Sequence, residues 1–297
     1  MSNRTGRPRR LVLQTSAKVN LALEVLGKRP DGYHEIATVT QTVDLFDRLT
    51  LEAAPTISLE TDDSALPADE RNLIVRAALL LRQVSGVEAG ARMRLRKRIP
   101  VAAGLGGGSS DAAATLWGLN RLWGLRWPRA RLSELAGRLG MDVPFFLTGG
   151  PALATGRGER VERLPAGGGY ALVLVNPRVP LSTAEVYERV PAGWRAEPAA
   201  TRRLVEALST RNAVRVGAAL TNDLEGFVAP SLPAVGRMKA ALLAAGALGA
   251  VMSGSGPTVV GMARSLDHAR QIRRRVSRAD WACWAVRTHS GPAIRVV

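Results

Sequence analysis

The chain has almost none of the residues that build cross-linked, cysteine-metal or membrane-spanning proteins. It contains one cysteine, Cys283, which excludes an internal disulfide and any multi-cysteine metal site. No apolar run reaches the roughly 20 residues that a helix needs to cross a bilayer. The basic N-terminus, MSNRTGRPRRLVLQ, lacks both the long apolar stretch and the small-residue cleavage site of a secretory signal. These absences predict a cytoplasmic protein with no membrane partner.

Aromatic residues are also scarce, at 4% of the 297 residues, so the core must be built mainly from Leu, Val, Ile and Ala. Hydrophobic residues make up 46% of the chain and charged residues 22%, a composition typical of globular rather than disordered proteins. The length is sufficient for two domains of ordinary size, each with a core of its own.

Acidic residues are few relative to basic ones, 25 against 41, which gives a net charge of +16. Such a balance suits a nucleic acid and, equally, a polyanionic small substrate. The basic residues are spread over the whole chain, without the dense patch and interleaved aromatics of single-strand-binding proteins. The densest run, residues 92–98, alternates charge with Met93 and Leu95, the pattern of a half-buried strand with a solvated outer face. An RNA-binding module stays a secondary hypothesis, and we expect no nucleic-acid partner.

Strand-like and helix-like segments follow one another without the strict alternation of a doubly wound parallel sheet, which favours an α+β fold. In the first half, we expect strands at residues 11–13, 19–25, 38–43, 48–51 and 92–99, a helix capped by Asn72 that ends close to Gly86, and helices at 111–122 and 129–139. In the second half, we expect strands at 170–176, 250–252, 258–262 and 281–287 and helices at 184–188, 199–208, 232–245 and 266–276. A composition shift at residues 164–169, LPAGGG, predicts the boundary between an N-terminal domain, 1–163, and a C-terminal domain, 164–297.

A glycine-rich loop, Gly104-Leu105-Gly106-Gly107-Gly108-Ser109-Ser110, joins an expected strand to an expected helix. Glycines let the backbone approach a ligand closely and adopt φ > 0, so that successive N–H groups can converge on one anion. The unpaired N–H groups and the dipole of the following helix favour a phosphate at the same place. The hydroxyls of Ser109 and Ser110 can donate to phosphate oxygens or bind Mg²⁺. The loop predicts a phosphate site, because a plain strand–helix connection needs fewer glycines and serines.

Three common phosphate-binding motifs are excluded by the residues around this loop. A Walker A loop ends in Gly-Lys-Ser/Thr, and no lysine lies near the end of this one. A dinucleotide-binding fingerprint needs a third glycine where Ser109 stands and an acidic residue about 20 positions later, where Arg131 stands. A protein kinase needs the His-Arg-Asp and Asp-Phe-Gly motifs, and neither occurs.

Two segments near the N-terminus carry candidate binding residues. Lys18 and Asn20 alternate with apolar neighbours, so they share one face of a strand and could line a pocket; an ordinary half-exposed edge strand would show the same pattern. Tyr33 and His34 follow the turn signal Asp31-Gly32. An aromatic ring beside a donor–acceptor ring suits a heterocyclic base, stacked on one side and hydrogen-bonded at its edge, although His34 could equally be a loop residue without function.

Asp142 is a candidate catalytic carboxylate. It precedes Val143-Pro144 and an apolar run, which is also the pattern of a helix N-cap. Phosphoryl transfer to a hydroxyl calls for a carboxylate that accepts the proton and a cation that steadies it. Lys18 and Asp142 can supply this pair only if the fold brings them together.

Taken together, three motifs in this order resemble the GHMP kinase superfamily, which includes galactokinase and the homoserine and mevalonate kinases. They are Ala17-Lys18-Val19-Asn20-Leu21, the Pro-x-x-x-Gly-Leu-Gly-x-x-Ser-Ser pattern at residues 100–110, and the turn Ser253-Gly254-Ser255-Gly256-Pro257. The three consecutive glycines, Gly32-Tyr33-His34 and the segment DVPFF at 142–146 are similar to the members that phosphorylate the 2-hydroxyl of a cytidine diphosphate-linked methylerythritol in non-mevalonate isoprenoid synthesis. The likeness spans about residues 15–261. An enzyme acting on homoserine or mevalonate is the alternative, but such substrates have no nucleobase that the residues at 33–34 could bind.

The resemblance implies a role for each matched residue. Asp142 would be the catalytic base, with Lys18 nearby to favour its charged form and bind the substrate hydroxyl, and Asn20 would orient the erythritol. His34 would hydrogen-bond the cytosine between the rings of Tyr33 and Tyr187. The residues implied in ATP binding are Lys97, Pro100, Val101, Ala102, Ala103, Gly104, Leu105, Gly106, Gly107, Gly108, Ser109 and Ser110. Contact with phosphate is implied for Ser110 or Thr183, and helix capping or a metal role for Asp111.

The resemblance also implies a fold, cofactors and an assembly state. The superfamily pairs a ribosomal protein S5 domain 2-like N-terminal domain with a ferredoxin-like C-terminal domain, and ATP and substrate meet in the cleft between them. ATP and Mg²⁺ would be the cofactors, with no protein residues assigned to the metal, and a monomer or weak homodimer is expected. Two features depart from the pattern. Ala102 stands where glycine is frequent, which requires the loop to close there with φ < 0, and residues 1–10 are expected to form a disordered basic tail.

Overall fold

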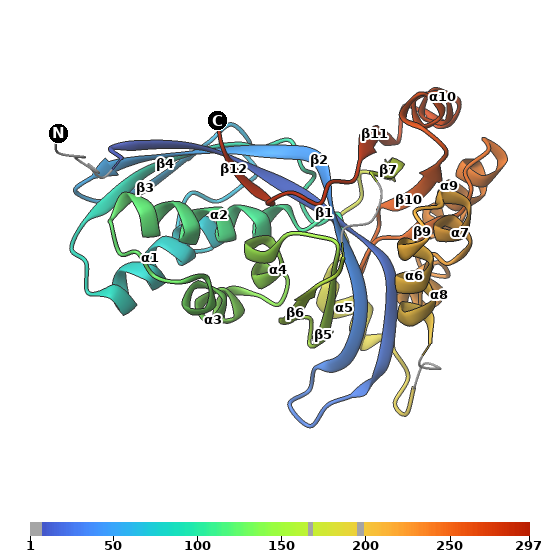
Figure 1. Cartoon of the computed structure of the whole chain (residues 1–297), viewed down its shortest axis with the longest axis horizontal. Helices are drawn as coiled ribbons and strands as arrows, with labels where there is room; N and C mark the ends of the chain where they lie inside the picture. Colours follow the sequence, from blue (N-terminus) through green and yellow to red (C-terminus); the bar gives the residue numbers. More distant parts are fainter. Residues whose placement is uncertain (1–7, 166–168, 195–198) are drawn as a thin grey trace.

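The computed structural model describes residues 8–165, 169–194 and 199–297, and its elements form two bodies side by side (Figure 1). The left-hand body in that view holds an eight-stranded sheet with helices α1 to α4 on one face, and the right-hand body holds a four-stranded sheet with helices α6 to α10. Residues 1–7 of the expected tail and 166–168 of the expected domain boundary lie outside the described residues. The last residue of that tail, Arg10, is not disordered, because it begins the first strand. The mixture of helices with mainly antiparallel strands agrees with the α+β prediction.

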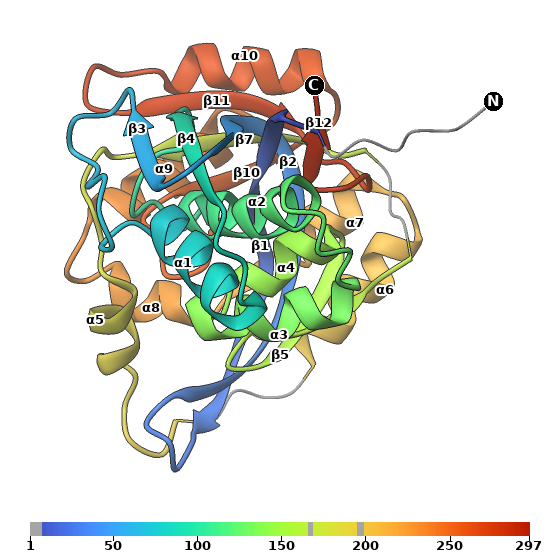
Figure 2. The ribbon, with the colours of Figure 1, turned by 90° about the vertical axis from the view of Figure 1, so that its left-hand side faces the viewer.

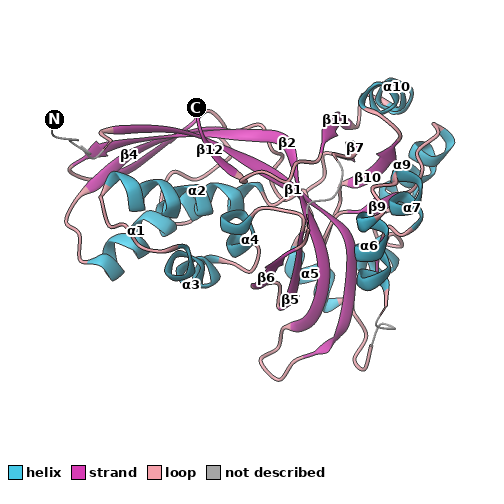
Figure 3. Cartoon of the chain, viewed as in Figure 1, coloured by secondary structure: helices cyan, strands magenta, loops and turns pink. Residues whose placement is uncertain are grey.

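The larger sheet is built on two long antiparallel strands, β1 (Arg10–Lys28) and β2 (His34–Ala54), joined by the turn predicted at Asp31-Gly32. Its strand order is β12-β1-β2-β4-β3, with β5 and β6 attached to β2 and with β8 paired with β1. These further strands are β3 (Ile57–Thr61), β4 (Gly90–Arg96), β5 (Ala152–Gly156), β6 (Arg160–Arg163), β8 (Thr221–Asn222) and β12 (Ile294–Val296). Figure 3 shows the β1–β2 hairpin leaving the sheet and running down between the two bodies.

The four short strands expected before residue 52 are in fact two continuous ones. The register of β1 on β2 shifts between Ser16 and Ala17, between Asn20 and Ala22, and again near Gly27. Each such bulge bends a strand and increases its twist, which lets a pair this long leave the sheet and reach the second body. This continuity could not be predicted from the sequence, because polar residues interrupt the apolar alternation of both strands.

Four helices cover one face of the larger sheet, with α1 and α2 in front in the view of Figure 2: α1 (Leu73–Ser85), α2 (Gly107–Leu122), α3 (Arg129–Leu139) and α4 (Val143–Thr148). The predicted caps of α1 are confirmed, since Asn72 accepts a hydrogen bond from the Ile74 amide and Gly86 closes the helix at φ +68°. Helix α2 packs very closely on the sheet at Gly118, where a Cβ atom would lie 2.3 Å from Leu51 Cδ1. This contact fixes α2, and with it the glycine-rich loop, against β1 and β2.

The smaller sheet is antiparallel, with the order β11-β7-β10-β9. Its strands are β7 (Ala171–Asn176), β9 (Ala250–Met252), β10 (Val259–Ala263) and β11 (Ala282–Arg287). The helices that follow residue 180 are α5 (Thr183–Glu188), α6 (Ala200–Ser209), α7 (Ala213–Ala218), α8 (Leu224–Val228), α9 (Ala234–Ala244) and α10 (Leu266–Val276). The short elements β3, β5, β6, β8, β12, α7 and α8 were not expected, because each is too short to show a periodic pattern.

The two bodies share chain segments and a buried core. Strands β8 and β12, from the second half of the sequence, both pair with β1. The Glu24 carboxylate of β1 accepts hydrogen bonds from the first backbone amides of α6, Ala200 (2.6 Å) and Ala199 (2.9 Å) among them. Burial opposes the charge of Glu24, but the hydrogen bonds outweigh it and lower the pKa of this carboxyl. Among the described residues, the helices are all too short or too polar to cross a membrane.

Candidate active site

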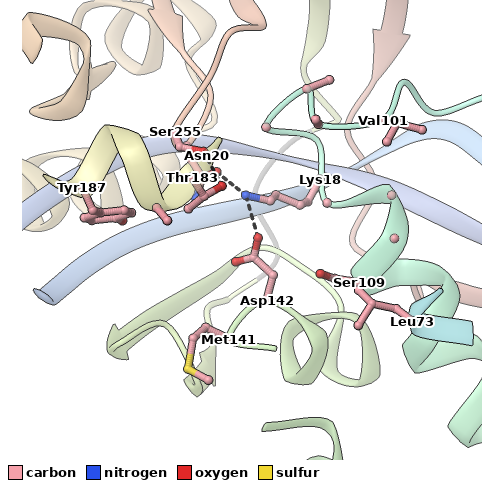
Figure 4. A pocket seen from close by; sticks show the side chains of 18 of the residues that line it. Lys18, Asn20, Leu73, Val101, Ser109, Met141, Asp142, Thr183, Tyr187 and Ser255 are labelled. Atoms are coloured by element: carbon pink, nitrogen blue, oxygen red, sulfur yellow. Dashed lines mark hydrogen bonds and ion pairs between the residues drawn. The ribbon is translucent and has the colours of Figure 1, made fainter. Parts of the chain in front are cut away.

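A cavity of about 910 Å³ opens where the β1–β2 hairpin, the glycine-rich loop and the second body meet. Its walls come from β1 and β2, from the loop at 100–109, from the start of α4, and from α5 and the turn at 253–257. Figure 4 shows the side chains of Lys18, Asn20, Asp142, Thr183 and Ser255 gathered at its centre. Cavities that bind small molecules usually measure about 300–1,000 Å³, so this one has room for a large ligand.

Lys18 and Asp142 meet inside this cavity, as the sequence analysis required for a kinase. The Lys18 ammonium lies 3.3 Å from the Asp142 carboxylate and donates a hydrogen bond of 2.6 Å to Asn20 Oδ1. Lys18 and Asn20 share one face of β1, as their spacing predicted. Two threonine hydroxyls of β2 accept hydrogen bonds from the side-chain nitrogen of Asn20, Thr38 at 2.8 Å and Thr40 at 3.2 Å. These bonds fix the amide so that its oxygen faces the ammonium.

The N-cap alternative for Asp142 is correct for its position but not for its side chain. Asp142 does occupy the N-cap position of α4, but it adopts φ −82° and ψ −15° and its side chain makes no capping hydrogen bond. A capping residue ordinarily has an extended backbone and bonds an amide of the first turn. The Asp142 carboxylate instead points into the cavity toward Lys18 (Figure 4).

The glycine-rich loop closes tightly over β1. Gly104 and Gly106 adopt φ of +74° and +68°, and Gly106 is the N-cap of α2, which begins four residues before the expected position. A Cβ atom on Gly106 would lie 2.9 Å from Lys18 Cγ, and one on Gly104 would lie 2.4 Å from the Ser253 carbonyl oxygen. Only glycine fits both positions. The expectation for Ala102 is wrong, since this residue adopts φ +50°, in the left-handed region that a Cβ disfavours.

Nine of the eleven loop residues at 100–110 line the cavity, and two do not. Ser110 is fully buried, contacts the Thr15 hydroxyl, and donates a hydrogen bond of 2.7 Å to the Ser16 carbonyl oxygen of β1. The Leu105 side chain is also fully buried. Ser110 therefore anchors α2 to β1 and does not reach the cavity, which corrects the expectation that its hydroxyl touches phosphate. Ser109 does line the cavity.

Lys97 lines the cavity but already has two anionic partners. Its ammonium contacts the buried Asp47 carboxylate and lies 2.9 Å from Asp111 Oδ2. Burial opposes the charge of Lys97, yet the two carboxylates outweigh it and raise the pKa of this ammonium. Burial also raises the pKa of Asp111, to about 7, although the Lys97 ammonium opposes that rise. Asp111 lies inside α2 and so does not cap it, and the described part of the chain holds no group of three or more His, Cys, Asp and Glu suited to a metal ion.

The far end of the cavity carries aromatic rings. His34 stacks on Tyr187, with ring centroids 5.3 Å apart and planes inclined by 29°. Tyr33 is 50% exposed, and the guanidinium carbon of Arg157 lies 4.9 Å from its ring centroid. Burial, with help from Lys28, lowers the pKa of His34, so its ring is neutral at neutral pH. The predicted residues Tyr33, His34 and Tyr187 thus lie in one cavity, although His34 and Tyr187 contact each other directly.

Thr183, at the start of α5, reaches the cavity beside the predicted glycine-serine turn. Its hydroxyl lies 2.9 Å from the hydroxyl of Ser255. Both residues line the cavity together with Gly254. The three sequence motifs are therefore neighbours in space.

Comparison with known proteins agrees with this geometry. The family model for the N-terminal domain of GHMP kinases matches residues 72–150, and the one for the C-terminal domain of GHMP kinases matches residues 204–283. A protein of Pelotomaculum thermopropionicum, named 4-diphosphocytidyl-2-C-methyl-D-erythritol kinase, is 50% identical over 92% of this chain and 96% of its own length. The protein of the same name from Symbiobacterium thermophilum is 48% identical over 93% of this chain and 99% of its own. The chain belongs to the GHMP kinase family.

A solved structure supports the same assignment. The crystal structure of a 4-(cytidine 5'-diphospho)-2C-methyl-D-erythritol kinase superimposes with a TM-score of 0.82 at 36% identity, covering 95% of this chain and 100% of that one. The fold that the sequence motifs implied, the two-domain GHMP kinase fold, is therefore confirmed. The chain is a small-molecule kinase.

Sequence reasoning missed several residues that line the cavity of this GHMP kinase. Arg157 lies between Gly156 and Gly158, whose φ values of +75° and +114° make a tight turn, and this Gly-Arg-Gly spacing was the available signal. Met141, beside Asp142 in the sequence, lies in the same wall. An apolar end of the cavity was also largely missed because its residues are scattered along the chain; it comprises Leu66, Pro67, Leu73 and Leu95, together with Val101, which was expected.

Proposed function

We propose that this GHMP kinase transfers the γ-phosphoryl group of ATP to the 2-hydroxyl of 4-diphosphocytidyl-2-C-methyl-D-erythritol, a step of non-mevalonate isoprenoid synthesis. The observation that carries the proposal is the Lys18–Asp142 pair, 3.3 Å apart, between a glycine-rich loop and a set of aromatic rings. The loop suits the phosphates of ATP, the rings suit a nucleobase, and the pair lies between them. The names of the relatives supply the identity of the substrate.

The pair gives the chemistry of the transfer. The Asp142 carboxylate accepts the proton of the 2-hydroxyl as that oxygen forms its bond to the γ-phosphorus, and the bond to the β,γ-bridging oxygen breaks to release ADP. Lys18 lies close enough to Asp142 to contact the same hydroxyl oxygen and to steady the charge that develops there. Asn20, fixed by two threonines, is placed to orient the erythritol chain. Positioning and charge supply most of the catalysis in phosphoryl transfer.

The nucleotide would lie along the loop and the first turn of α2. The amides of Gly107, Gly108 and Ser109, at the start of α2, have no partner inside the helix and suit phosphate oxygens. Lys97 is already paired with Asp47 and Asp111, so we propose that it donates a hydrogen bond to the nucleotide rather than net positive charge. The apolar end defined above would hold the adenine, because a flat base gains by leaving water for an apolar slot.

The cytidine would lie at the aromatic end. We propose that its base inserts between the rings of Tyr33 and Tyr187 and displaces part of the contact that Tyr187 makes with His34. A neutral imidazole offers one donor and one acceptor, which matches the alternating groups on the edge of cytosine. Homoserine and mevalonate carry no ring to occupy this end, which makes them the weaker candidates.

We propose that Mg²⁺ accompanies ATP. Mg²⁺ usually keeps several waters and is held by the phosphates together with one or two protein oxygens. The Ser109 hydroxyl, which lines the cavity at the start of α2, can supply one such oxygen. Removing Mg²⁺ with a chelator and restoring it should abolish and then recover ADP formation.

The direct test is ADP formation by the purified protein with ATP, Mg²⁺ and the cytidyl substrate. Homoserine and mevalonate in place of that substrate serve as controls. Formation of ADP with the cytidyl substrate alone supports the proposal. No ADP above background with it, or faster turnover of either control, contradicts the proposed substrate.

A further inference from the structure

The turn at residues 253–256 contacts the functional side chains, and one buried residue outside the cavity holds it in place. The Ser253 hydroxyl accepts a hydrogen bond from the backbone amide of Asn20 (3.1 Å) and donates one to the Gly104 carbonyl oxygen (3.0 Å). Gly254 adopts φ +56°, and a Cβ there would lie 2.9 Å from Asn20 Oδ1 and 3.3 Å from Lys18 Nζ. A shift of this turn would therefore displace Lys18, Asn20 and the glycine-rich loop together, because the turn contacts all three.

Strand β1 depends on this turn because, within the described residues, no other strand covers its edge beside Lys18. On that edge, β12 pairs with β1 at residues 13–15 and β8 pairs at residues 22–23. Between them, the backbone amide of Lys18 donates to the Leu105 carbonyl oxygen (2.9 Å), and the backbone amide of Asn20 donates to the Ser253 hydroxyl. On this edge, the backbone that carries Lys18 is thus held by the loop and the turn, whereas its opposite edge pairs with β2.

Asn222, in β8, fixes the carbonyl groups of the turn. Its amide nitrogen donates to two backbone oxygens, those of Met252 and Gly254, each at 2.7 Å. Its amide oxygen accepts from the Leu224 amide at 2.9 Å, so all of its hydrogen-bonding groups except one lone pair are used. Asn222 is 9% exposed and does not line the cavity. The neighbouring Glu225 accepts from the Met252 amide at 2.9 Å, which also holds the residue at the start of the turn.

We infer that Asn222 is a positioning residue for Lys18 and Asn20: it holds the turn that completes the free edge of β1. This inference rests on the proposed function, since it assigns Asn222 to the reaction that Lys18 and Asp142 perform. Asn222 acts through backbone carbonyls and never touches substrate. Its loss should leave the chain folded with the functional pair misplaced.

The test compares Asn222→Ala with a matched control, Asn120→Ala. Asn120 is 8% exposed, donates to the Trp127 carbonyl oxygen (3.1 Å) and accepts from the Trp127 amide (2.9 Å), so it makes nearly the same kinds of bonds. It lies near the far end of α2, roughly 20 Å along the axis from the start of that helix. Both variants should lose a similar amount of thermal stability. Only Asn222→Ala should lose kcat, on the order of 10²-fold, the scale of a 1 Å misplacement.

A second variant, Asn222→Asp, keeps the volume of the side chain and adds a readout that a purely structural role would not give. The introduced carboxylate would face two carbonyl oxygens and repel them, while its protonated form could donate to one of them. Burial and these carbonyls favour the protonated form. The kcat of this variant relative to wild type should therefore rise as the pH is lowered from about 8 to about 6.

Hydrogen exchange separates this inference from the proposed function. In Asn222→Ala, the amides of residues 16–22 should exchange faster than in wild type, whereas in Asn120→Ala they should not change. This measurement needs no substrate, so it decides the positioning of β1 even if the cytidyl substrate gives no ADP. Unchanged exchange in Asn222→Ala, or a loss of kcat in Asn120→Ala equal to that in Asn222→Ala, would overturn the inference while the proposed function stands.

Discussion

The Lys18 ammonium lies 3.3 Å from the Asp142 carboxylate, and the two side chains differ sharply in exposure, 6% for Lys18 and 50% for Asp142. Lys18 is thus a fixed cation inside the protein, while Asp142 stands at the cavity surface where a hydroxyl can reach it. A group that accepts a proton from a substrate must be accessible to it, whereas a group that steadies charge works best when held rigidly. The asymmetry suits Asp142 as the proton acceptor and Lys18 as the steadying cation.

Asp142→Asn should fold normally and lose kcat by about 10²–10⁴-fold, because a positioned base contributes on this scale. The amide keeps the shape of the side chain but cannot accept the proton. Steady-state ADP formation measures the loss, and circular dichroism checks the fold. The exposed Asp280, changed to Asn, is the matched control and should retain full activity.

Lys18→Met probes the other half of the pair. Methionine fills a similar volume in a site where Lys18 is nearly buried, so the loss is mainly one of charge. Both kcat and the affinity for the cytidyl substrate should fall. Wild-type kinetics in either Asp142→Asn or Lys18→Met would remove the pair from the mechanism.

His34→Ala should raise the KM for the cytidyl substrate and leave the KM for ATP unchanged. The loss of one neutral hydrogen bond corresponds to about 1 kcal/mol, or a KM increase of roughly fivefold. His268, on the distant helix α10, provides the matched control as His268→Ala. If the KM for the cytidyl substrate does not change in His34→Ala, the cytosine of the substrate is not recognised at this end of the cavity.

Asp111→Asn should change how stability depends on pH. Burial raises the pKa of Asp111 to about 7, above its reference value of 3.8. The folded protein then binds more protons than the unfolded chain between about pH 4 and pH 7, so the free energy of unfolding falls as the pH rises through this window. Asparagine removes this dependence. Urea unfolding at about pH 5 and pH 8 should show the variant gaining stability relative to wild type at the higher pH.

The measurement on Asp111→Asn has a clear opposite outcome. A constant stability difference between variant and wild type across this pH range would mean that Asp111 stays charged throughout. Asp280→Asn, at an exposed position, gives the baseline for removing a carboxylate without burial.

Ala102→Gly should not destabilise the protein, unlike most alanine-to-glycine changes in ordered segments. Ala102 adopts φ +50°, and the left-handed region costs a residue with a Cβ about 1–2 kcal/mol. Glycine removes that cost, which offsets the roughly 0.5–1 kcal/mol of chain entropy that glycine loses on folding. The exposed Ala65, outside the left-handed region, is the control and should lose stability as Ala65→Gly. Chemical denaturation measures both, and equal losses would contradict the argument.

Much of the local structure followed from the sequence because its causes are local. The Asn72 cap and the Gly86 stop are decided within one turn of helix, and both were correct. The face shared by Lys18 and Asn20 follows from the two-residue repeat of a strand. The three motifs specified the family, and the comparisons confirmed it.

Other features depended on residues distant in the sequence, and there the predictions failed or stayed open. Asp142 fits an N-cap by its neighbours, yet it faces Lys18, because α4 packs beside β1 in the fold. Ser110 was expected at the phosphates, but α2 lies on β1 and uses that hydroxyl as an anchor.

The sequence by itself determined which residues are present for the chemistry and where most of the longer helices and strands lie, since repeats, caps and glycines act over a few residues. Only the tertiary structure decided that Lys18 meets Asp142 at 3.3 Å, that Lys97 is already paired, and that the edge of β1 is completed by a turn held by Asn222. Distances between residues far apart in the chain are set by the packing of whole elements, and no local pattern encodes them.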